Sequence, residues 1–410
     1  MPAPRCDAAI RLTLAWAVTH ATLLLVTWPL WTPQRGVPRI APLVALPAAL
    51  EFGLLFVIAI GLVSVCLAPT ASRRGVRLAT IALLVLVGSD QLRWQPWAYH
   101  ALLVGTVLAL CDARRAFIVL RLLAIAVYAY SAIAKLDAEF VATLGQQMLS
   151  VLLRPFGVGP SSLGGLIANA AALALPISEL VLAVLLAAAW RWQRLAMVAC
   201  IATAVMHATT IVVLGPWGLG HSLGVLLWNV GFVWQTIVLF ASSLPDREEV
   251  HASSRSGSFA AATVILLGVV APLGTPFGLW DQWPGWALYA PGGERATLFV
   301  HSAATDRLPE SLLPHVESTA DADSPWRRVS LDDWVLEATN APIYPQNRVV
   351  AAIAAGLLDR YPLGGRVRVV AESRAGPLSR KRQLVELTTR DEIEAASALL
   401  GLRPTVDWSR

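Results

Sequence analysis

Long apolar segments that are almost free of charge constrain this chain more than any other feature of its sequence. They follow one another between Ala8 and Phe277 and are separated by short polar loops. A bilayer core about 30 Å thick requires about 20 consecutive apolar residues in each crossing helix. The repeated segments therefore predict a polytopic α-helical membrane protein.

The composition agrees with this class and argues against nucleic acid as a partner. Charged residues make up 14% of the chain and apolar residues 56%, whereas soluble domains carry about 25% charged residues. The net charge is +5, but the arginines lie mainly in short loops between apolar segments, where they determine topology. No basic stripe interleaved with aromatic residues is present.

The apolar pattern predicts about nine transmembrane helices. They are expected at residues 8–31, 42–68, 75–92, 96–111, 115–135, 162–190, 192–214, 219–242 and 259–278. The third and fourth are short, so a single bent or re-entrant unit is the alternative there. Residues 138–156 are weakly amphipathic and are expected to lie in the membrane interface. The first segment is too long for a signal peptide and is interpreted as a membrane helix.

The distribution of basic residues predicts the orientation. With the N-terminus in the cytoplasm, the inner segments carry Arg5, Arg11, Arg73, Arg74, Arg77, Arg114, Arg115, Arg191, Arg194, Arg247 and Arg255. The outer segments then carry only Arg35, Arg39, Arg93, Lys135 and Arg154. The excess favours a cytoplasmic N-terminus in the cell membrane, and nine crossings place the C-terminal domain outside.

The composition changes near Trp280. Trp280, Trp283 and Trp286 resemble an aromatic belt where the last helix leaves the bilayer. Mixed charge, proline and glycine follow, with strand-like alternation at 298–301 and 367–371 and helical patterns at 346–361 and 389–400. We therefore predict an all-α membrane bundle over 1–280 and a small α+β soluble domain over 281–410.

The cysteines do not predict a metal site. Cys6, Cys66, Cys111 and Cys200 lie in or beside predicted helices and show no CxxC spacing. No catalytic GxSxG, HExxH or P-loop pattern is present either. We expect no bound metal and interpret the cysteines as small apolar residues.

Ionisable residues at membrane depth are the candidate functional residues, because each costs about 2.5–3.5 kcal/mol on insertion. They are His20, Glu51, Asp90, Arg93, His100, Lys135, Asp137, Glu179, His207 and His221. In the predicted topology most of them lie at the outer ends of the helices. This placement predicts a polar cavity open to the outer face.

Each of these residues also has a structural interpretation. Asp90 and Arg93 are spaced i,i+3 and can pair with each other. His207 can serve as a hydrogen bonder between helices, and Lys135 as an interfacial residue that extends to water. Glu179 has no partner nearby in the sequence, so it is either a protonated carboxyl or the partner of Lys135 or of a histidine.

Lys135 is the strongest candidate because it follows the apolar stretch Leu122–Ala134. Apolar surroundings disfavour the charged form of an amine, and a neutral amine near pH 7 can act as a general base. His207 is a candidate for sharing or relaying the proton.

The segment Tyr128–Met148, YAYSAIAKLDAEFVATLGQQM, resembles the core motif of the vitamin K-dependent gamma-carboxylase family, also called HTTM-domain membrane proteins. The specific part is the string Ala134–Phe140, AKLDAEF. Weaker likenesses extend the resemblance over about residues 8–290, at 90–97, 177–180, 206–207 and 283–289.

The resemblance implies chemistry on a reduced, vitamin K-like quinone. The animal enzyme oxidises a vitamin K hydroquinone with O₂ to the epoxide, using a lysine that matches Lys135 as the base. We accordingly predict Lys135 and His207 as catalytic residues. The predicted substrate-binding residues are Asp90, Arg93, His100, Tyr128, Asp137, Glu179 and His221. The soluble region is far smaller than in the animal enzyme, so glutamate carboxylation does not carry over.

Other classes of function remain as alternatives. The first is a non-catalytic membrane scaffold or binding protein whose outer domain recruits a protein partner. A transporter is a second alternative, but the sequence shows no inverted repeat of the kind many transporters have. A haem protein is a third, and it would require His100 and His207 to lie at matching depth in the membrane. A membrane lipid or quinone is the expected small partner.

Overall fold

The computed structural model describes residues 6–33, 36–41, 46–245, 255–317, 324–376, 381–397 and 405–407. Arg5, Arg35 and Arg247, which entered the orientation argument, lie outside these residues. The chain is mostly helical and divides into two compact units. The first comprises 1–25, 57–81 and 99–292, and the second comprises 26–56, 82–98 and 293–410.

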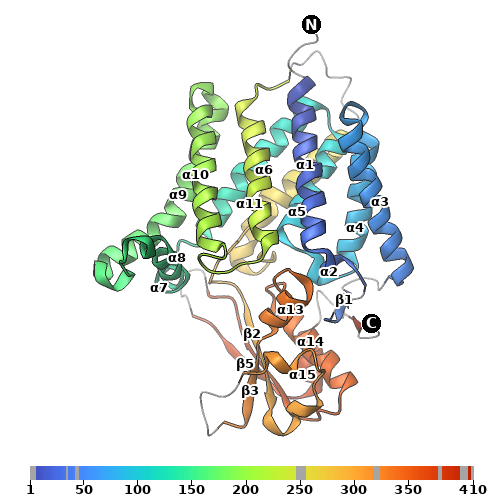
Figure 1. Cartoon of the computed structure of the whole chain (residues 1–410), viewed down its shortest axis with the longest axis vertical. Helices are drawn as coiled ribbons and strands as arrows, with labels where there is room; N and C mark the ends of the chain where they lie inside the picture. Colours follow the sequence, from blue (N-terminus) through green and yellow to red (C-terminus); the bar gives the residue numbers. More distant parts are fainter. Residues whose placement is uncertain are drawn as a thin grey trace. The chain divides into compact units, whose positions relative to one another are not determined.

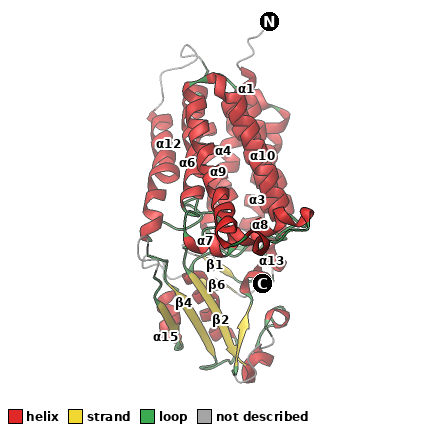
Figure 2. Ribbon diagram, turned by 90° about the vertical axis from the view of Figure 1, so that its left-hand side faces the viewer, coloured by secondary structure: helices red, strands yellow, loops and turns green. Residues whose placement is uncertain are grey.

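Seven helices in the described part of the chain are long and apolar enough to cross a membrane, which indicates a multi-pass membrane protein. They are α1 (Cys6–Val26), α3 (Ala48–Leu67), α6 (Ala113–Ile133), α9 (Gly165–Arg191), α10 (Ala196–Leu214), α11 (Leu223–Ala241) and the helix that begins with α12 (Arg255–Ile265), labelled in Figures 1 and 2.

The expected count of nine is not confirmed. The other two apolar segments form α4 (Arg73–Gly88) and α5 (Pro96–Leu110), which have 16 and 15 residues. At 1.5 Å per residue they are shorter than the hydrocarbon core. The segment expected at the interface forms two short helices, α7 (Ala138–Ala142) and α8 (Leu144–Leu153).

Helix α6 is central to the first unit. Two thirds of its span is buried, with Phe117 and Leu123 among its core residues. Helix α11 approaches α1 closely at Gly231, where an added Cβ would lie 2.2 Å from a methyl of Thr19. Only glycine therefore fits at this helix crossing.

The last apolar helix changes its hydrogen-bonding pattern where three aromatic side chains meet it. After α12 it continues as a π-helical segment, Leu266–Val270, and a 3₁₀ segment, Ala271–Phe277. Pro272 has no N–H, so the Gly268 carbonyl four residues earlier loses its helical donor. That carbonyl accepts from the Trp286 indole at 2.8 Å, and the carbonyls on either side accept from Tyr99 and Tyr130.

This arrangement corrects the prediction for Trp286. The residue was expected in an interfacial aromatic belt, but its side chain is fully buried in the first unit. The run of tryptophans resembled a belt because spacing alone does not distinguish an interfacial indole from one that caps a buried carbonyl.

The second unit contains a four-stranded antiparallel sheet of order β3-β2-β4-β5. Its strands are β2 (Arg295–His301), β3 (Trp326–Val329), β4 (Val367–Glu372) and β5 (Leu384–Leu387). A separate pair, β1 (Arg39–Ala41) with β6 (Thr405–Asp407), brings chain from before the third helix beside chain near the C-terminus.

One helix packs on this sheet where the sequence predicts a helix. Helix α14 (Asn347–Arg360) packs on β2 and β4 and buries Val349, Ile353 and Leu357. Helix α15 (Arg390–Ala396) packs against α14, and helix α13 (Leu331–Thr339) was not predicted from the sequence. The end of the predicted helix at 389–400 falls on residues outside the description. The expected α+β elements are therefore present, and the domain boundary at residue 280 stays a prediction.

Candidate functional site

Lys135 lies in the turn directly after α6. Its side chain is buried, and its Nζ is 2.6 Å from Oγ of Ser131, one helical turn back. A lysine at the end of a helix reaches that preceding turn because Cα–Cβ bonds tilt toward the helix N-terminus. The amine is therefore held against α6 and does not extend to water.

Glu179 is the ionic partner of Lys135. It lies on α9, and its Oε2 is 2.8 Å from Nζ of Lys135. The carbonyl of Leu288 is a third acceptor, at 3.4 Å. Three acceptors match the three N–H groups of a protonated lysine. Of the two structural alternatives for Glu179, partnership with Lys135 is the one observed.

Pro176 gives this part of α9 an unusual backbone. It lies inside the helix and removes one N–H from the hydrogen-bond ladder. The hydroxyl of Ser178 donates to the Leu175 carbonyl at 2.7 Å. Pro176 and Ser178 both lie just before Glu179 in α9.

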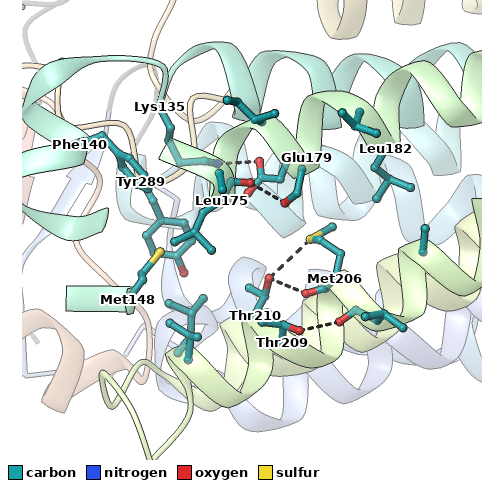
Figure 3. A pocket seen from close by; sticks show the side chains of 18 of the residues that line it. Lys135, Phe140, Met148, Leu175, Glu179, Leu182, Met206, Thr209, Thr210 and Tyr289 are labelled. Carbon is teal, nitrogen blue, oxygen red and sulfur yellow. Dashed lines mark hydrogen bonds and ion pairs between the residues drawn. The ribbon is translucent and has the colours of Figure 1, made fainter. Parts of the chain in front are cut away.

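A cavity of about 580 Å³ lies beside the Lys135–Glu179 pair. Figure 3 shows the pair on one side and Met206, Thr209 and Thr210 of α10 on the other. Most of the remaining wall is aliphatic, from Leu175, Leu182, Leu185, Val205, Val213 and Leu214. An apolar cavity with one ionic pair is typical of a site for an amphiphilic small molecule.

Several lining residues are also exposed on the surface of the first unit. Ile177, Val181 and Val205 are 44%, 59% and 60% exposed. They belong to helices that are candidate membrane spans. Exposed aliphatic side chains on helices of this kind are suited to contact with hydrocarbon.

Two polar residues of the loops close to the cavity are uncharged at neutral pH. Tyr289 lines the cavity, and burial raises the pKa of its phenol, so it keeps its proton. His221 packs edge-on against the Tyr289 ring, with centroids 5.3 Å apart. Burial lowers the pKa of His221, which therefore stays neutral.

His207 belongs to a hydrogen-bonded chain beside the cavity and does not line it. Its Nδ1 is 2.7 Å from Oδ1 of Asn229, and its Nε2 is 2.8 Å from the Tyr128 hydroxyl. The Asn229 amide donates to the Val225 carbonyl, so its oxygen faces His207. Nδ1 then carries the hydrogen, and Tyr128 donates to Nε2.

These hydrogen bonds link α6, α10 and α11. They agree with the structural interpretation of His207 as a hydrogen bonder between helices. The Glu179 carboxylate is close enough to act electrostatically on both His207 and Tyr128. Phe232 packs against both rings. Both ring nitrogens of His207 already have hydrogen-bond partners. A catalytic role for His207 therefore stays a prediction.

The Tyr128→Phe variant is expected to lose about 1 kcal/mol of unfolding free energy. It leaves Nε2 of His207 without its donor, and a single interhelical hydrogen bond contributes about this much in a membrane protein. The measurement is unfolding in mixed micelles, in a double-mutant cycle with His207→Leu. Additive losses, with no coupling energy, would show that the hydrogen bond does not stabilise the fold.

His100 occupies an aromatic environment. Its ring makes edge contacts with Trp228, Phe232 and Trp286 at centroid distances of 5.2–6.3 Å. It is buried and does not line the cavity. Asp137 caps α7 by accepting from the Phe140 N–H at 2.6 Å. The backbone N–H of Asp137 donates to the Lys135 carbonyl at 2.9 Å. Substrate binding by His100 or Asp137 stays a prediction.

Asp90 and Arg93 belong to the second unit, where they form a buried ionic cluster with Arg39 and Glu51. The two carboxylate oxygens of Glu51 accept from Arg39 and from Arg93, the latter at 2.9 Å. Asp90 lies 3.9 Å from Arg93, as the i,i+3 spacing suggested. All four side chains are at most 5% exposed.

Arg93 also terminates two helices. Its guanidinium donates to the carbonyls of Leu30 and Trp31 at the end of α2 (Trp28–Trp31), and to Leu86 in the last turn of α4. Carbonyls at helix ends have no internal donor. The cluster therefore links several parts of the second unit. Neither Asp90 nor Arg93 lines the cavity beside Lys135, and substrate binding by them stays a prediction.

One signal for the site was present in the sequence and was not used. The chain contains 32 basic residues, but only Lys135 and Lys381 are lysines. Arginine is always protonated in proteins, whereas lysine can release its proton when buried. A single lysine among the membrane segments therefore distinguishes Lys135 from the arginines as a candidate for proton exchange. Tyr289, far away in sequence, carried no comparable signal.

Comparison with known proteins identifies no relative of this chain. No protein-family model, curated protein or solved structure matches this chain. Within the described residues there is no group of three or more histidine, cysteine or carboxylate side chains arranged to hold a metal ion.

Proposed function

We propose that the protein binds an amphiphilic lipid with a hydroxylated ring, such as a reduced quinone, and exchanges a proton with it through Lys135 and Glu179. The observation that carries the proposal is the buried ionic pair at the edge of a cavity with an otherwise aliphatic wall. Charged pairs at membrane depth are costly and persist where they serve a function.

The cavity supports this class of ligand by its size and its walls. About 580 Å³ lies in the range of small-molecule sites. The aliphatic wall suits a ring and the start of an apolar tail, while Tyr289, Thr209 and Thr210 offer hydroxyl groups. Exposed lining residues on α9 and α10 support entry from the lipid phase.

The pair supplies both functions that ionisation of a hydroxyl requires. Glu179, as a carboxylate, accepts the proton of the hydroxyl, and the Lys135 ammonium stabilises the oxyanion that forms. If Lys135 acts as the base, as the sequence suggests, its own proton first passes to Glu179 along the 2.8 Å hydrogen bond. In both routes the pair gains one proton and the ligand loses one.

The resemblance of Tyr128–Met148 to the vitamin K-dependent carboxylases supports a reduced quinone and O₂ as co-reactants. One hydroquinone and one O₂ give one quinone epoxide and one water, which balances atoms and electrons. Removal of the first proton makes the hydroquinone a better electron donor. Carboxylation of glutamate is not included in the proposal.

The proposed topology has the N-terminus in the cytoplasm and the C-terminal domain outside. Seven crossings or nine give the same result, because both numbers are odd. The excess of arginine in the inner loops supports this orientation.

Binding is tested by labelling the amines. An amine-reactive acyl reagent modifies lysines only in their neutral form, and peptide mass spectrometry separates the two lysines of the chain. We expect exposed Lys381 to react freely, and Lys135 to react slowly and to be protected by a non-oxidisable quinol analogue. Equal protection of both lysines, or none, would contradict binding at Lys135.

Catalysis is tested with the purified protein, reduced vitamin K and O₂, with epoxide as the product measured. Lys135→Ala is expected to abolish epoxide formation, and Lys381→Ala, which removes the other lysine, to leave it unchanged. Protection of Lys135 without epoxide formation would favour the alternative, a lipid-binding module that recruits a partner through its outer domain.

A further inference from the structure

An open groove lies between α6 and α12, at the ends of these helices that carry arginine. The two helices pack against each other (Figure 2), and the groove between them has a volume of about 820 Å³. Ile118, Ala262 and Ile265 contribute aliphatic surface to its wall. The groove belongs to the opposite end of α6 from Lys135, about 30 Å away at 1.5 Å per residue.

Arg114 and Arg115 line the same groove. Nη1 of Arg115 donates to Oγ of Ser258 at 3.1 Å, and its Nε is 3.8 Å from Asp112. Nη1 of Arg114 donates to the Pro245 carbonyl at 2.9 Å. Each guanidinium has five N–H donors, so within the described residues both arginines retain donors for a further acceptor.

The charge around this end of the groove is positive. Asp112 offsets one of the two arginines, but Arg73 is close enough to act electrostatically on the adjacent Cys111, and Arg77 reaches the Ala109 carbonyl. Arg255 begins α12 and is exposed. The N-terminus of α6 adds the positive end of a helix dipole.

We propose that this groove binds an anionic phospholipid, with its phosphate at Arg114 and Arg115 and an acyl chain along Ile118, Ala262 and Ile265. Arginine forks bind phosphate oxygens through charge-assisted hydrogen bonds, and basic pockets between membrane helices bind acidic head groups. The aliphatic wall distinguishes a lipid from a free anion. The proposal does not depend on the chemistry at Lys135.

The experiment measures lipid binding to the detergent-purified full chain by native mass spectrometry. Dioleoyl phosphatidylglycerol is expected to bind at least about tenfold more tightly than dioleoyl phosphatidylcholine, given about 1 kcal/mol for each arginine near an acidic head group. The double variant Arg114→Gln, Arg115→Gln should remove this preference. It keeps the α6 cap, since Asp112 accepts from the backbone N–H of Arg115.

Two matched controls keep the result interpretable. Arg191→Gln with Arg194→Gln removes the same charge from an exposed turn between α9 and α10 and should retain the preference. Ala262→Trp fills the groove without changing charge and should abolish binding, whereas Leu266→Trp, at an exposed position outside the groove, should not. The Ala262 variant also tests the proposal if the arginine variant fails to fold.

Three results would overturn the proposal. Equal binding of the two lipids would remove the role of the head-group charge. Retained preference in the Ala262→Trp variant would place the lipid elsewhere. Equally effective competition by inorganic phosphate would make the groove a site for a free anion.

Discussion

Glu51→Ala is expected to lower the free energy of unfolding by about 3–5 kcal/mol, because it leaves two arginines buried without their shared carboxylate. Arg39 and Arg93 each donate to one oxygen of Glu51, and none of the three side chains is more than 5% exposed. Asp90 stays near Arg93 in the variant but is 3.9 Å away, and Arg39 still donates to the Leu46 carbonyl at 2.8 Å.

The measurement is chemical unfolding of the purified protein in mixed micelles. Glu310→Ala removes an exposed carboxylate from the same unit and is expected to change stability by less than about 0.5 kcal/mol. Pairing Glu51→Met with Arg39→Met should recover part of the loss, since one uncompensated charge then disappears. A loss below about 1 kcal/mol for Glu51→Ala would mean that water reaches the arginines.

Lys135→Met is expected to lower the free energy of unfolding by about 3 kcal/mol, because Glu179 then loses its ionic partner in a mostly apolar site. Glu179→Met is expected to cost less. The ammonium would still have Ser131 and the Leu288 carbonyl as acceptors. The double variant should be more stable than Lys135→Met, since it leaves no unpaired charge beside the cavity.

This double variant separates structure from chemistry. If it is as well folded as the wild type but binds no quinol analogue and forms no epoxide, the pair acts on the ligand and does not merely support the bundle. Losses that simply add, measured by the same unfolding method, would mean that the two charges do not interact energetically.

The sequence predicted the helices and strands better than it predicted the contacts between distant residues. The run of apolar segments predicted membrane helices, and strand alternation at 298–301 and 367–371 predicted β2 and β4. These are local patterns with a period of their own, so the sequence carries them directly. The expected count of nine spans is not confirmed, because α4 and α5 are shorter than the hydrocarbon core of a bilayer.

The partners of the buried charges were not predictable in the same way. Glu51 is 42 residues from Arg93, and Glu179 is 44 residues from Lys135. The Asp90–Arg93 pair was visible because i,i+3 neighbours share a helical face. A buried charge was therefore predictable from the residue type and its apolar flanks, whereas its partner was not.

By itself the sequence determined the class of the protein, the approximate positions of its helices and the place of Lys135 at the end of an apolar segment, because hydropathy is a property of local segments. Only the tertiary structure decided that Trp286 caps the Gly268 carbonyl, that Arg93 belongs to a structural cluster, and that His207 is hydrogen-bonded at both nitrogens. Each of these depends on which distant backbone or side-chain group needs a hydrogen-bond partner, and packing alone supplies that information.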